Sequence, residues 1–232
     1  MIKCENVYKV YGDEAAKTEA LKNVSLEIKE GQFIVILGPS GSGKSTLLNV
    51  ISGLDQVTKG RVVVKEKVIT DLSQKALTLF RREHLGFIFQ SYHLMPTLTV
   101  SENVEMGAYL ASNEQAIDDA LEAVDMTKHK DKYPHQLSGG EQQRVSIARA
   151  TVKDPSILFC DEPTGSLDEK TGKKVLSILE QLNKDSRTTI VLITHNPSIA
   201  EMADVIIKMH SGEIQSIEDN PSKKDAQSIQ WA

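Results

Sequence analysis

The chain has 232 residues, of which 40% are hydrophobic and 25% are charged, a balance typical of a folded protein rather than a disordered segment. Its formal net charge of -5 offers no basic surface to a phosphate backbone, so a nucleic-acid partner is not expected. The two cysteines, Cys4 and Cys160, are too few for a disulfide framework and favour a reducing compartment.

No feature of the sequence predicts a membrane span or an export signal. No window approaches about 18 uninterrupted apolar residues. The first residues, MIKCENVYK, lack the apolar stretch of a signal peptide. We therefore expect a cytosolic protein, and if it works at a membrane we expect another chain to span that membrane.

The first part of the chain has the patterns of several strands and one helix. About the first thirty residues alternate apolar and polar positions, as half-buried strands do. FIVILG at 33–38 is continuously apolar, which predicts a strand buried on both faces. KSTLLNVISGL then predicts a helix that ends at Gly53. RVVVKEKVI at 61–69 and LGFIFQ at 85–90 predict two further strands.

The middle of the chain changes to a helical pattern. We expect Ser101 to cap a helical stretch that runs to about Asp125. Four apolar residues fall on one face of it, namely Ile117, Ala120, Leu121 and Val124. This block interrupts the alternation of strands and helices, and it predicts a separate all-α lobe over about residues 91–155.

The last part of the chain returns to buried strands. SILFCD at 156–161 and TIVLIT at 189–194 are apolar runs of strand length, with a helix around VLSILEQL between them. Buried strands that alternate with helices predict a parallel sheet in an α/β fold. The tail, residues 219–232, is polar, and we expect it to be loose.

The loop GPSGSGKST fits the Walker A pattern and lies after a strand and before a helix, as that pattern requires. Its amides can surround the β-phosphate of a nucleotide, Lys44 can reach the β- and γ-phosphates, and the Ser45 hydroxyl can bind Mg²⁺. A Gly/Ser-rich loop that matches by accident is the alternative, and it leaves the flanking strand and helix unexplained. The predicted nucleotide-binding residues of this loop are Gly38, Pro39, Ser40, Gly41, Ser42, Gly43, Lys44, Ser45 and Thr46.

This loop does not fix the activity, because kinases, GTPases and ATPases share it. A GTPase is expected to carry N-K-x-D, and the nearest string, residues 183–186, has Ser186 where Asp is needed. A small-molecule kinase stays open on the loop alone.

An acidic pair ends the strand SILFCD. Asp161 is placed to hold the Mg²⁺ shell, and Glu162 points the other way, where it can orient an attacking water. The alternative is a pair of solvated acids in a turn, with Glu162 held extended because Pro163 follows it. With the Walker A loop in the same chain, we favour the catalytic interpretation.

Two more polar residues end predicted strands. His195 follows TIVLIT, and Gln90 ends LGFIFQ. Open α/β sheets bind ligands at the carboxyl ends of their strands. A lone histidine is more often structural than catalytic, and a lone glutamine is weaker evidence still. Gln90 can supply a carbonyl to Mg²⁺ and an amide to water.

The stretch LSGGEQQRVSIARA places Gly139 and Gly140 at the start of a helix, although glycine is about 1 kcal/mol less favourable there than alanine. Ser138 and Glu141 match a capping box, which leaves the glycine pair unexplained. The first amides of such a helix have no partners within the helix. Because glycine has no Cβ to obstruct them, these amides can bind an anion.

Taken in order, GPSGSGKST, Gln90, LSGGEQQ, ILFCDE, SLD and His195 resemble the ATPase of an ABC transporter. The resemblance covers nearly the whole chain, from Ile2 to about Ile217. In this family two ATPases pair head to tail, and the LSGGE helix of one faces the γ-phosphate held by the Walker A loop of the other. The resemblance thus implies that the anion at the LSGGE helix belongs to a second copy of the chain.

The resemblance also implies roles for single residues. Tyr11 would stack on adenine, and it fits better than Tyr8 because Gly12 follows it. Glu162 would be the base and His195 the γ-phosphate switch, while the loop 166–168 would cross the dimer interface. ATP and Mg²⁺ are the implied cofactors. The predicted site comprises Glu162, His195 and Lys44 as catalytic residues, Ser45, Gln90 and Asp161 at the metal, and Tyr11, the Walker A loop, Gln90, Ser138, Gly139, Gly140, Glu141 and Asp168 at the nucleotide.

The implied fold is an α/β P-loop NTPase of the ABC ATPase type, with a mixed-sheet core, an N-terminal antiparallel β subdomain and an inserted α-helical subdomain. We expect the ABC ATPase domain over 1–218. Its catalytic core and β subdomain would take about 1–90 and 156–218, its helical subdomain about 91–155, and the polar tail 219–232.

GLDQVTKG, RREHLGFIFQSYHLMPTLTVSENV and DEPTGSLD are similar to macrolide-export and lipoprotein-release ATPases of bacteria, a group with relatives in antimicrobial-peptide resistance and cell division. The chain departs from that group at Ser166, where Asn is usual, and at Asn196, where Asp is common. The segment between Asn103 and Leu137 is also somewhat short. These departures remove no catalytic group.

The implied partners are an integral membrane permease subunit and a second copy of the ATPase, with an extracytoplasmic adaptor protein left open. The chain would then be cytoplasmic and peripheral on the inner face of the cell membrane. The alternative is a soluble ABC ATPase of DNA repair, chromosome organisation or translation. Those usually carry two cassettes, a coiled-coil insert or basic extensions. The cargo and the direction of transport are not encoded here, because the membrane subunit reads the cargo.

SYHLMPTL at 91–98 has apolar residues that cannot form one buried stripe, because Pro96 keeps the segment from being a regular helix. Leu94, Met95 and Leu98 either fill the join between core and helical lobe, or form an exposed apolar groove for a partner. The resemblance implies that a short coupling helix of the permease docks there.

Overall fold

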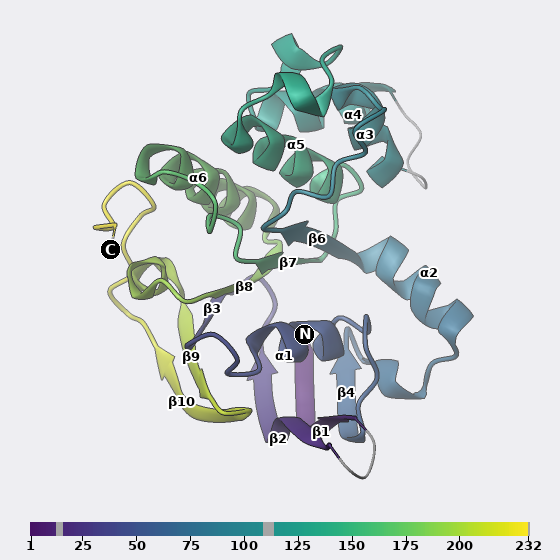
Figure 1. Cartoon of the computed structure of the whole chain (residues 1–232), viewed down its shortest axis with the longest axis vertical. Coiled ribbons are helices and arrows are strands. Elements are labelled where there is room, and N and C mark those ends of the chain that lie inside the picture. Colours follow the sequence, from purple (N-terminus) through teal and green to yellow (C-terminus); the bar gives the residue numbers. More distant parts are fainter. Residues whose placement is uncertain (13–15, 109–113, 232) are drawn as a thin grey trace.

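Figure 1 shows the computed structural model, which describes residues 1–12, 16–108 and 114–231. The N-terminal strands form a four-stranded antiparallel sheet in the order β2-β1-β4-β5. Its strands are β1 (Ile2–Tyr11), β2 (Thr18–Ile28), β4 (Lys59–Val64) and β5 (Lys67–Val68). The prediction of one strand over 61–69 is wrong. Lys65 and Glu66 have φ of 48° and 66° and turn the chain back into a tight hairpin.

A second, six-stranded sheet forms the centre of the molecule, in the order β10-β9-β3-β8-β7-β6. Its strands are β3 (Phe33–Leu37), β6 (Leu85–Phe89), β7 (Ile157–Asp161), β8 (Thr189–Thr194), β9 (Val205–His210) and β10 (Glu213–Asp219). All neighbouring pairs are parallel except β9 with β10, so the sheet is mixed, as expected. Every residue of β8 is buried, because both faces of the sheet are covered.

Alternate residues of the central strands face two different hydrophobic clusters. Ile190 and Leu192 of β8 belong to the cluster under the helices, whereas Val191 and Ile193 belong to the cluster shared with the antiparallel sheet. Helix α1 (Lys44–Ile51) fills the second cluster and lies between the two sheets, as Figure 1 shows. Helix α6 (Glu169–Ser186) covers the other face.

Helix α2 (Gln74–His84) was not predicted. It buries only Leu77 and Phe80, and most of its other residues are polar, so the apolar stripe is too narrow to identify from sequence. Ser73 caps it by accepting a hydrogen bond from the Ala76 amide. The short 3₁₀ helices of the chain are η1 (Ile69–Asp71), η2 (Met106–Ala108), η3 (Thr127–His129), η4 (Pro134–Gln136) and η5 (Pro197–Met202).

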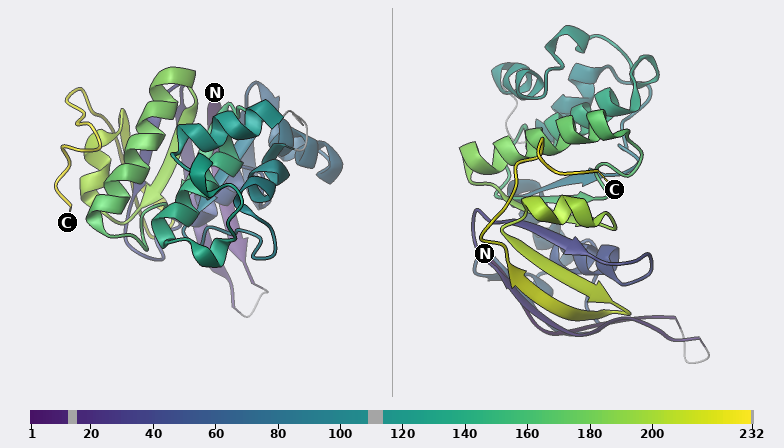
Figure 2. Two further views of the ribbon diagram at one scale, coloured as in Figure 1. Left: turned by 90° about the horizontal axis from the view of Figure 1, so that it is seen from above. Right: turned by 90° about the vertical axis from the view of Figure 1, so that its left-hand side faces the viewer.

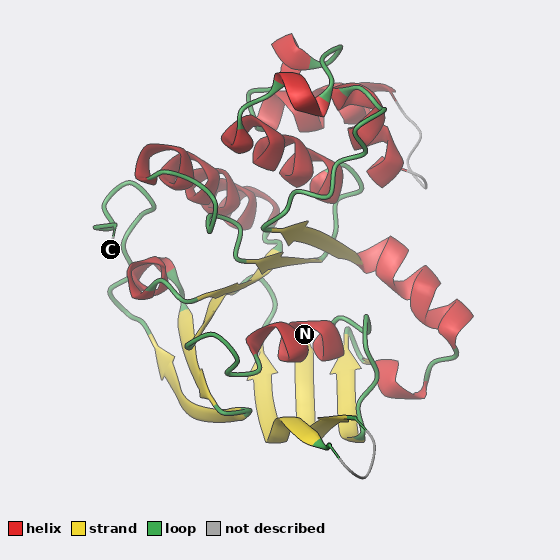
Figure 3. Cartoon of the chain, viewed as in Figure 1, coloured by secondary structure: helices red, strands yellow, loops and turns green. Residues whose placement is uncertain are grey.

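Three helices, α3 (Val100–Glu105), α4 (Glu114–Ala123) and α5 (Gly139–Thr151), gather beyond one edge of the central sheet (Figure 3). The predicted cap at Ser101 is wrong. Thr99 caps α3 in a capping box with Glu102. The Thr99 hydroxyl accepts from the Glu102 amide, and the Glu102 carboxylate accepts from the Thr99 amide. The four apolar residues predicted to share a face of the α4 segment are buried. Residues 109–113 of the predicted helical stretch lie outside the described residues.

The core beneath these helices is continuous with the core of the sheet, since Val145 and Ala148 of α5 pack in one cluster with Leu158 of β7. The limits of a helical subdomain therefore stay a prediction. Over the residues that the structure describes, no helix combines the length and the apolar character needed to cross a bilayer.

The expectation of a loose tail is wrong for its described part. Ala226 and Ile229 are buried, and the Trp231 ring packs where a Cβ on Gly172 of α6 would stand. The tail is fixed because it presents these apolar side chains to an uncovered surface of α6, and the Ala226 amide donates to Glu180. Figure 2 shows this segment crossing beside α6.

Candidate nucleotide site

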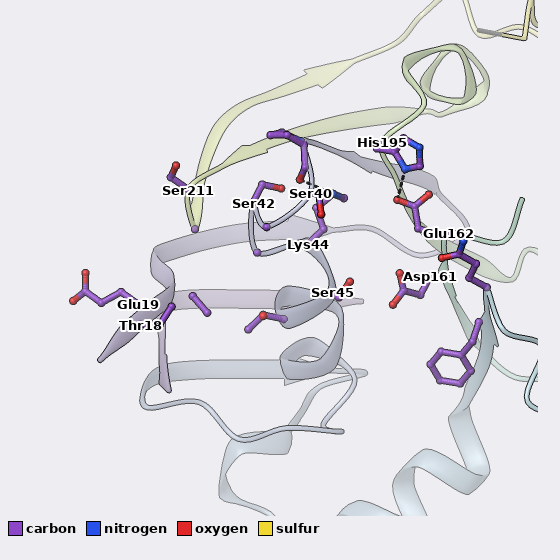
Figure 4. Close-up of a pocket in the computed structure, with 18 of the residues that line it drawn as sticks. Thr18, Glu19, Ser40, Ser42, Lys44, Ser45, Asp161, Glu162, His195 and Ser211 are labelled. Atoms are coloured by element: carbon purple, nitrogen blue, oxygen red, sulfur yellow. Dashed lines mark hydrogen bonds and ion pairs between the residues drawn. The ribbon is translucent and has the colours of Figure 1, made fainter. Parts of the chain in front are cut away.

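An open cavity of about 1050 Å³ lies where α1 meets the carboxyl ends of β6, β7 and β8 (Figure 4). Residues 18–20 and 211–212 form its far wall. The predicted site residues that line it are Pro39, Ser40, Gly41, Ser42, Gly43, Lys44, Ser45, Thr46, Gln90, Asp161, Glu162 and His195. The fold thus brings residues from four separate segments to one edge of the central sheet.

The loop between β3 and α1 needs its glycines for two reasons. Gly41 and Gly43 have φ of 77° and 97°, which other residues rarely adopt. Gly38 lies so close to β9 that a Cβ would stand 2.3 Å from the carbonyl oxygen of Met209. Because Gly43 precedes α1 and has no side chain, the first amides of that helix stay free to bind an anion.

Two side chains of this loop fit a phosphate ligand. Lys44 is buried, and its ammonium donates to the carbonyls of Gly38 (2.7 Å) and Pro39 (2.9 Å). The Ser42 hydroxyl is also buried, and it has no hydrogen-bond partner among the described residues. An unpaired buried hydroxyl beside a lysine and free amides is what a bound polyphosphate would satisfy.

Asp161 ends β7 and points toward Ser45 across the cavity (Figure 4). Burial raises the pKa of the Asp161 carboxyl, and the neighbouring charge of Glu162 raises it further. The hydrogen bond with Ser45 and the charge of Lys44 oppose both effects. A half-buried carboxylate beside a hydroxyl is an oxygen donor set suited to Mg²⁺.

Glu162 is held in place on both carboxylate oxygens. One accepts a hydrogen bond from the Thr194 hydroxyl at 3.1 Å, and the other lies 2.9 Å from His195 Nδ1. Its side chain is only 17% exposed, so Glu162 is not a solvated acid, although its carbonyl does accept from the Gly165 amide in a turn. The expected extended backbone is also wrong, because Glu162 has φ of 47° despite Pro163. Its amide donates to the carbonyl of Ile193.

His195 lies at the mouth of the cavity with 67% of its side chain exposed (Figure 4). It is therefore not a buried structural histidine. Gln90 also lines the cavity and donates to the Ser166 hydroxyl at 3.3 Å. Ser166, one of the departures from the resembled group, thus still offers a polar partner to Gln90.

Sequence reasoning missed the contacts that hold the segment after Gln90. Arg149, near the end of α5, donates to the carbonyls of Tyr92 (2.7 Å) and His93. Both of those residues have positive φ, 57° and 51°. Burial lowers the pKa of the Arg149 guanidinium. A contact between residues more than fifty positions apart leaves no local sequence pattern. The signal that could have indicated it is the position of Arg149 in an otherwise apolar part of the helix.

The start of α5 forms the predicted capping box. The Ser138 hydroxyl accepts from the Glu141 amide, and Glu141 accepts from the Ser138 amide at 2.7 Å. Packing inside the chain is a further reason for the glycines. A Cβ on Gly140 would stand 2.0 Å from Thr171 of α6, and one on Gly139 would stand 2.7 Å from the Tyr92 hydroxyl.

Not all predicted residues meet at the cavity. Within the described chain, Ser138–Glu141 and Tyr11 are not part of its lining, and Gly38 lies just before it. Asp168 caps α6 by accepting from the Thr171 amide at 3.1 Å. Hydrogen bonds from the Thr171 side chain and amide lower the pKa of the Asp168 carboxyl. These residues keep their binding roles only as predictions.

A family model described as ABC transporter matches residues 21–165, which is more than half of the chain. The chain belongs to the ABC transporter family. It is 47% identical, over its whole length, to the putative ABC transporter ATP-binding protein MG065 homolog of Mycoplasma pneumoniae, of which it spans only half. It is 45% identical over 88% of its length to the macrolide export ATP-binding/permease protein MacB of Shigella flexneri, and covers 32% of that protein.

Among solved structures, the chain superposes on the ATP-binding cassette MJ0796 of Methanocaldococcus jannaschii in a dimeric post-hydrolysis state bound to ADP and Pi. The TM-score is 0.88 at 40% identity, over 94% of this chain and 98% of the other. The P-loop ABC ATPase fold and the resemblance to the macrolide-export and lipoprotein-release group are thereby confirmed. The chain is an ATP-hydrolysing ABC ATPase of the transporter class, and the alternative of DNA repair, chromosome organisation or translation is not supported.

Proposed function

We propose that this ABC ATPase dimerises on ATP and drives an integral membrane permease of the macrolide-export, antimicrobial-peptide-export or lipoprotein-release type. One observation carries the proposal. The cavity gathers a phosphate loop, two acids and a histidine, while the first amides of α5, at Gly139 and Gly140, lie outside its lining. A second copy of the chain supplies those amides if the two copies pair head to tail. The dimeric state of MJ0796 supports the pairing of two copies.

The Walker A residues bind the polyphosphate in this proposal. Lys44 leaves the carbonyls of Gly38 and Pro39 to contact the β- and γ-phosphates, and the Ser42 hydroxyl gains a partner. Ser45, Asp161 and Gln90 would hold Mg²⁺, which when bound neutralises charge on the β- and γ-oxygens. Mg²⁺ would also favour the charged carboxylate of Asp161 against the effect of burial.

Glu162 orients the attacking water and receives its proton. The hydrogen bond from the Thr194 hydroxyl fixes the carboxylate before nucleotide arrives, so the carboxylate needs little reorganisation during the reaction. His195 is exposed enough to turn from Glu162 to a γ-phosphate. Asp168, at the start of α6, lies in the loop that we place at the interface between the two copies.

We place the permease contact on the segment after Gln90. Asn103 is buried and holds the backbone of this segment, through bonds with Met95, Leu98 and Thr99, while the Met95 side chain stays 44% exposed. Leu94 and Leu98 are half-buried. The backbone of this segment is fixed, and the exposed thioether of Met95 can adapt its shape. Such a surface is suited to bind a helix of a partner protein.

Replacing Met95 with Asp is expected to abolish co-purification with the permease. An apolar contact would strip the water from the carboxylate, and that desolvation opposes binding. The isolated ATPase should fold and bind ATP as before, since the side chain is exposed. Ile217→Asp, at a similarly exposed position on β10, is the matched control and should keep the permease. Normal co-purification of the Met95 variant would rule out this surface.

The location of the ATPase and its cargo depend on the permease. A permease would hold the ATPase at the cytoplasmic, inner face of the cell membrane. An extracytoplasmic adaptor protein is suggested only by the resemblance to macrolide exporters. The cargo is read by the permease, so it is not assigned from this chain.

A further inference from the structure

A buried lysine and an aspartate hold the ring of Tyr11. Lys9 of β1 is only 9% exposed, and its ammonium donates to Asp55 Oδ1 and to the carbonyl of Gln56, both at 2.7 Å. The Tyr11 phenol donates to the other carboxylate oxygen of Asp55 at 2.6 Å. Asp55 thus uses one oxygen for the lysine and the other for the tyrosine.

The lysine also covers the tyrosine ring. Its ammonium lies over the ring, 4.7 Å from the centroid, in a cation–π contact. Tyr11 nevertheless remains 40% exposed. A ring that is tied at its hydroxyl and has a cation on one face offers its other face as a flat surface of fixed orientation.

The same network is attached to the helix that follows the Walker A loop. The amide of Asp55 donates to the carbonyl of Asn49 in the last turn of α1, at 3.0 Å. Burial and the contact with Asp55 raise the pKa of the Tyr11 phenol, and a hydrogen bond with the Thr46 side chain, in the first turn of α1, opposes them. The distance between the ring and the phosphate loop is therefore set by one helix of eight residues.

The charge on Asp55 fits this arrangement. Burial acts to raise the pKa of its carboxyl, but the hydrogen bonds from Lys9, Tyr11 and the Gln56 amide outweigh burial and lower the pKa. The carboxylate is thus ionised at neutral pH and remains a strong acceptor for both partners.

We propose that Asp55 and Lys9 are positioning residues that orient the Tyr11 ring to stack on the adenine of ATP. The inference rests on the proposed ATP-binding function and on the adenine-binding role that the family resemblance predicts for Tyr11. Without the network the exposed ring is free to rotate, and ordering it on binding lowers the affinity. The effect should fall mainly on the base, because the network reaches the phosphate-binding residues through α1, at Thr46 and Asn49.

Asp55→Asn is the main test, measured on the full chain with ATP and with inorganic tripolyphosphate, which has no base. The affinity for ATP should fall about tenfold, since one base–aromatic stack is weakened. The affinity for tripolyphosphate and the kcat at saturating ATP should stay the same. Tyr11→Phe, which keeps the ring but loses the bond to Asp55, should show the same selective loss of affinity for ATP over tripolyphosphate, and Asp55→Glu should restore part of the ATP affinity.

Tyr11→Ala separates failure of this inference from failure of the proposed adenine site. Unchanged ATP affinity in Tyr11→Ala would overturn the adenine role itself. A clear loss in Tyr11→Ala, with no loss in either Asp55→Asn or Tyr11→Phe, would overturn the positioning role alone. Equal losses for ATP and tripolyphosphate in Asp55→Asn would also overturn it, because the network would then act on the phosphate loop. If Asp55→Asn does not fold, Tyr11→Phe alone decides.

Discussion

Replacing Glu162 with Gln should nearly abolish ATP turnover and leave ATP binding intact. The amide has the size of the carboxylate and can keep the contacts with Thr194 and His195, but it cannot take a proton from water. Loss of a positioned general base lowers kcat by about 10²- to 10⁴-fold. ATP then stays bound, so gel filtration with ATP should show a stable dimer, and gel filtration with ADP should show less of it.

Glu218→Gln is the matched control for this change. Glu218 pairs with Lys208 on the β9–β10 hairpin, away from the cavity, and its neutralisation should leave both turnover and elution unchanged. A Glu162 variant that hydrolyses ATP at the parent rate would contradict the assignment of the base. A variant that neither hydrolyses nor binds ATP would show that Glu162 serves the fold of the site instead.

Replacing Gly139 with Asp should remove turnover without removing ATP binding by the single subunit. Aspartate near a helix N-terminus is favourable for the helix. The nearest obstacle to its Cβ is the hydroxyl end of Tyr92, a flexible side chain. Its carboxylate, however, repels the γ-phosphate that the partner brings to this helix. Loss of preorganised electrostatic stabilisation should cost about 10²-fold or more in kcat.

Gly139→Ala adds the same Cβ without the charge, and it should keep activity within a few fold of the parent protein. Activity close to the parent rate in both the Asp and the Ala variants would show that charge at this helix end does not matter. Equal loss in both would assign Gly139 to packing against Tyr92. Gly140 is unsuitable for this comparison, since any Cβ there meets Thr171 at 2.0 Å.

The strands of the central sheet could be predicted because burial on both faces leaves continuous apolar runs such as 189–194. The Walker A loop, Asp161 and the capping box at Ser138 could be predicted because each is a contiguous pattern with a local cause. Sequence alone also placed Gln90 and His195 at the right sheet edge, because parallel strands end there together.

The misses share a different cause, namely contacts between segments far apart in the chain. The backbone of Glu162 follows the hydrogen bond to Ile193 rather than the preference of the residue before proline. The tail is fixed by a surface of α6 that only the folded chain presents. Lys9, Asp55 and Tyr11 meet from segments more than forty residues apart, so no local pattern reports their network.

The central claim is that each active site is built from two copies of the chain, and mixing two inactive variants tests it most directly. Lys44→Ala removes the lysine that contacts the phosphates but keeps an intact start of α5. Gly139→Asp keeps the lysine but places a negative charge at the start of α5. Each should be near zero alone. An equal mixture should recover about a quarter of the parent ATPase rate if subunits pair at random and the sites act independently. No recovery at any mixing ratio, with heterodimers shown to form, would contradict the claim.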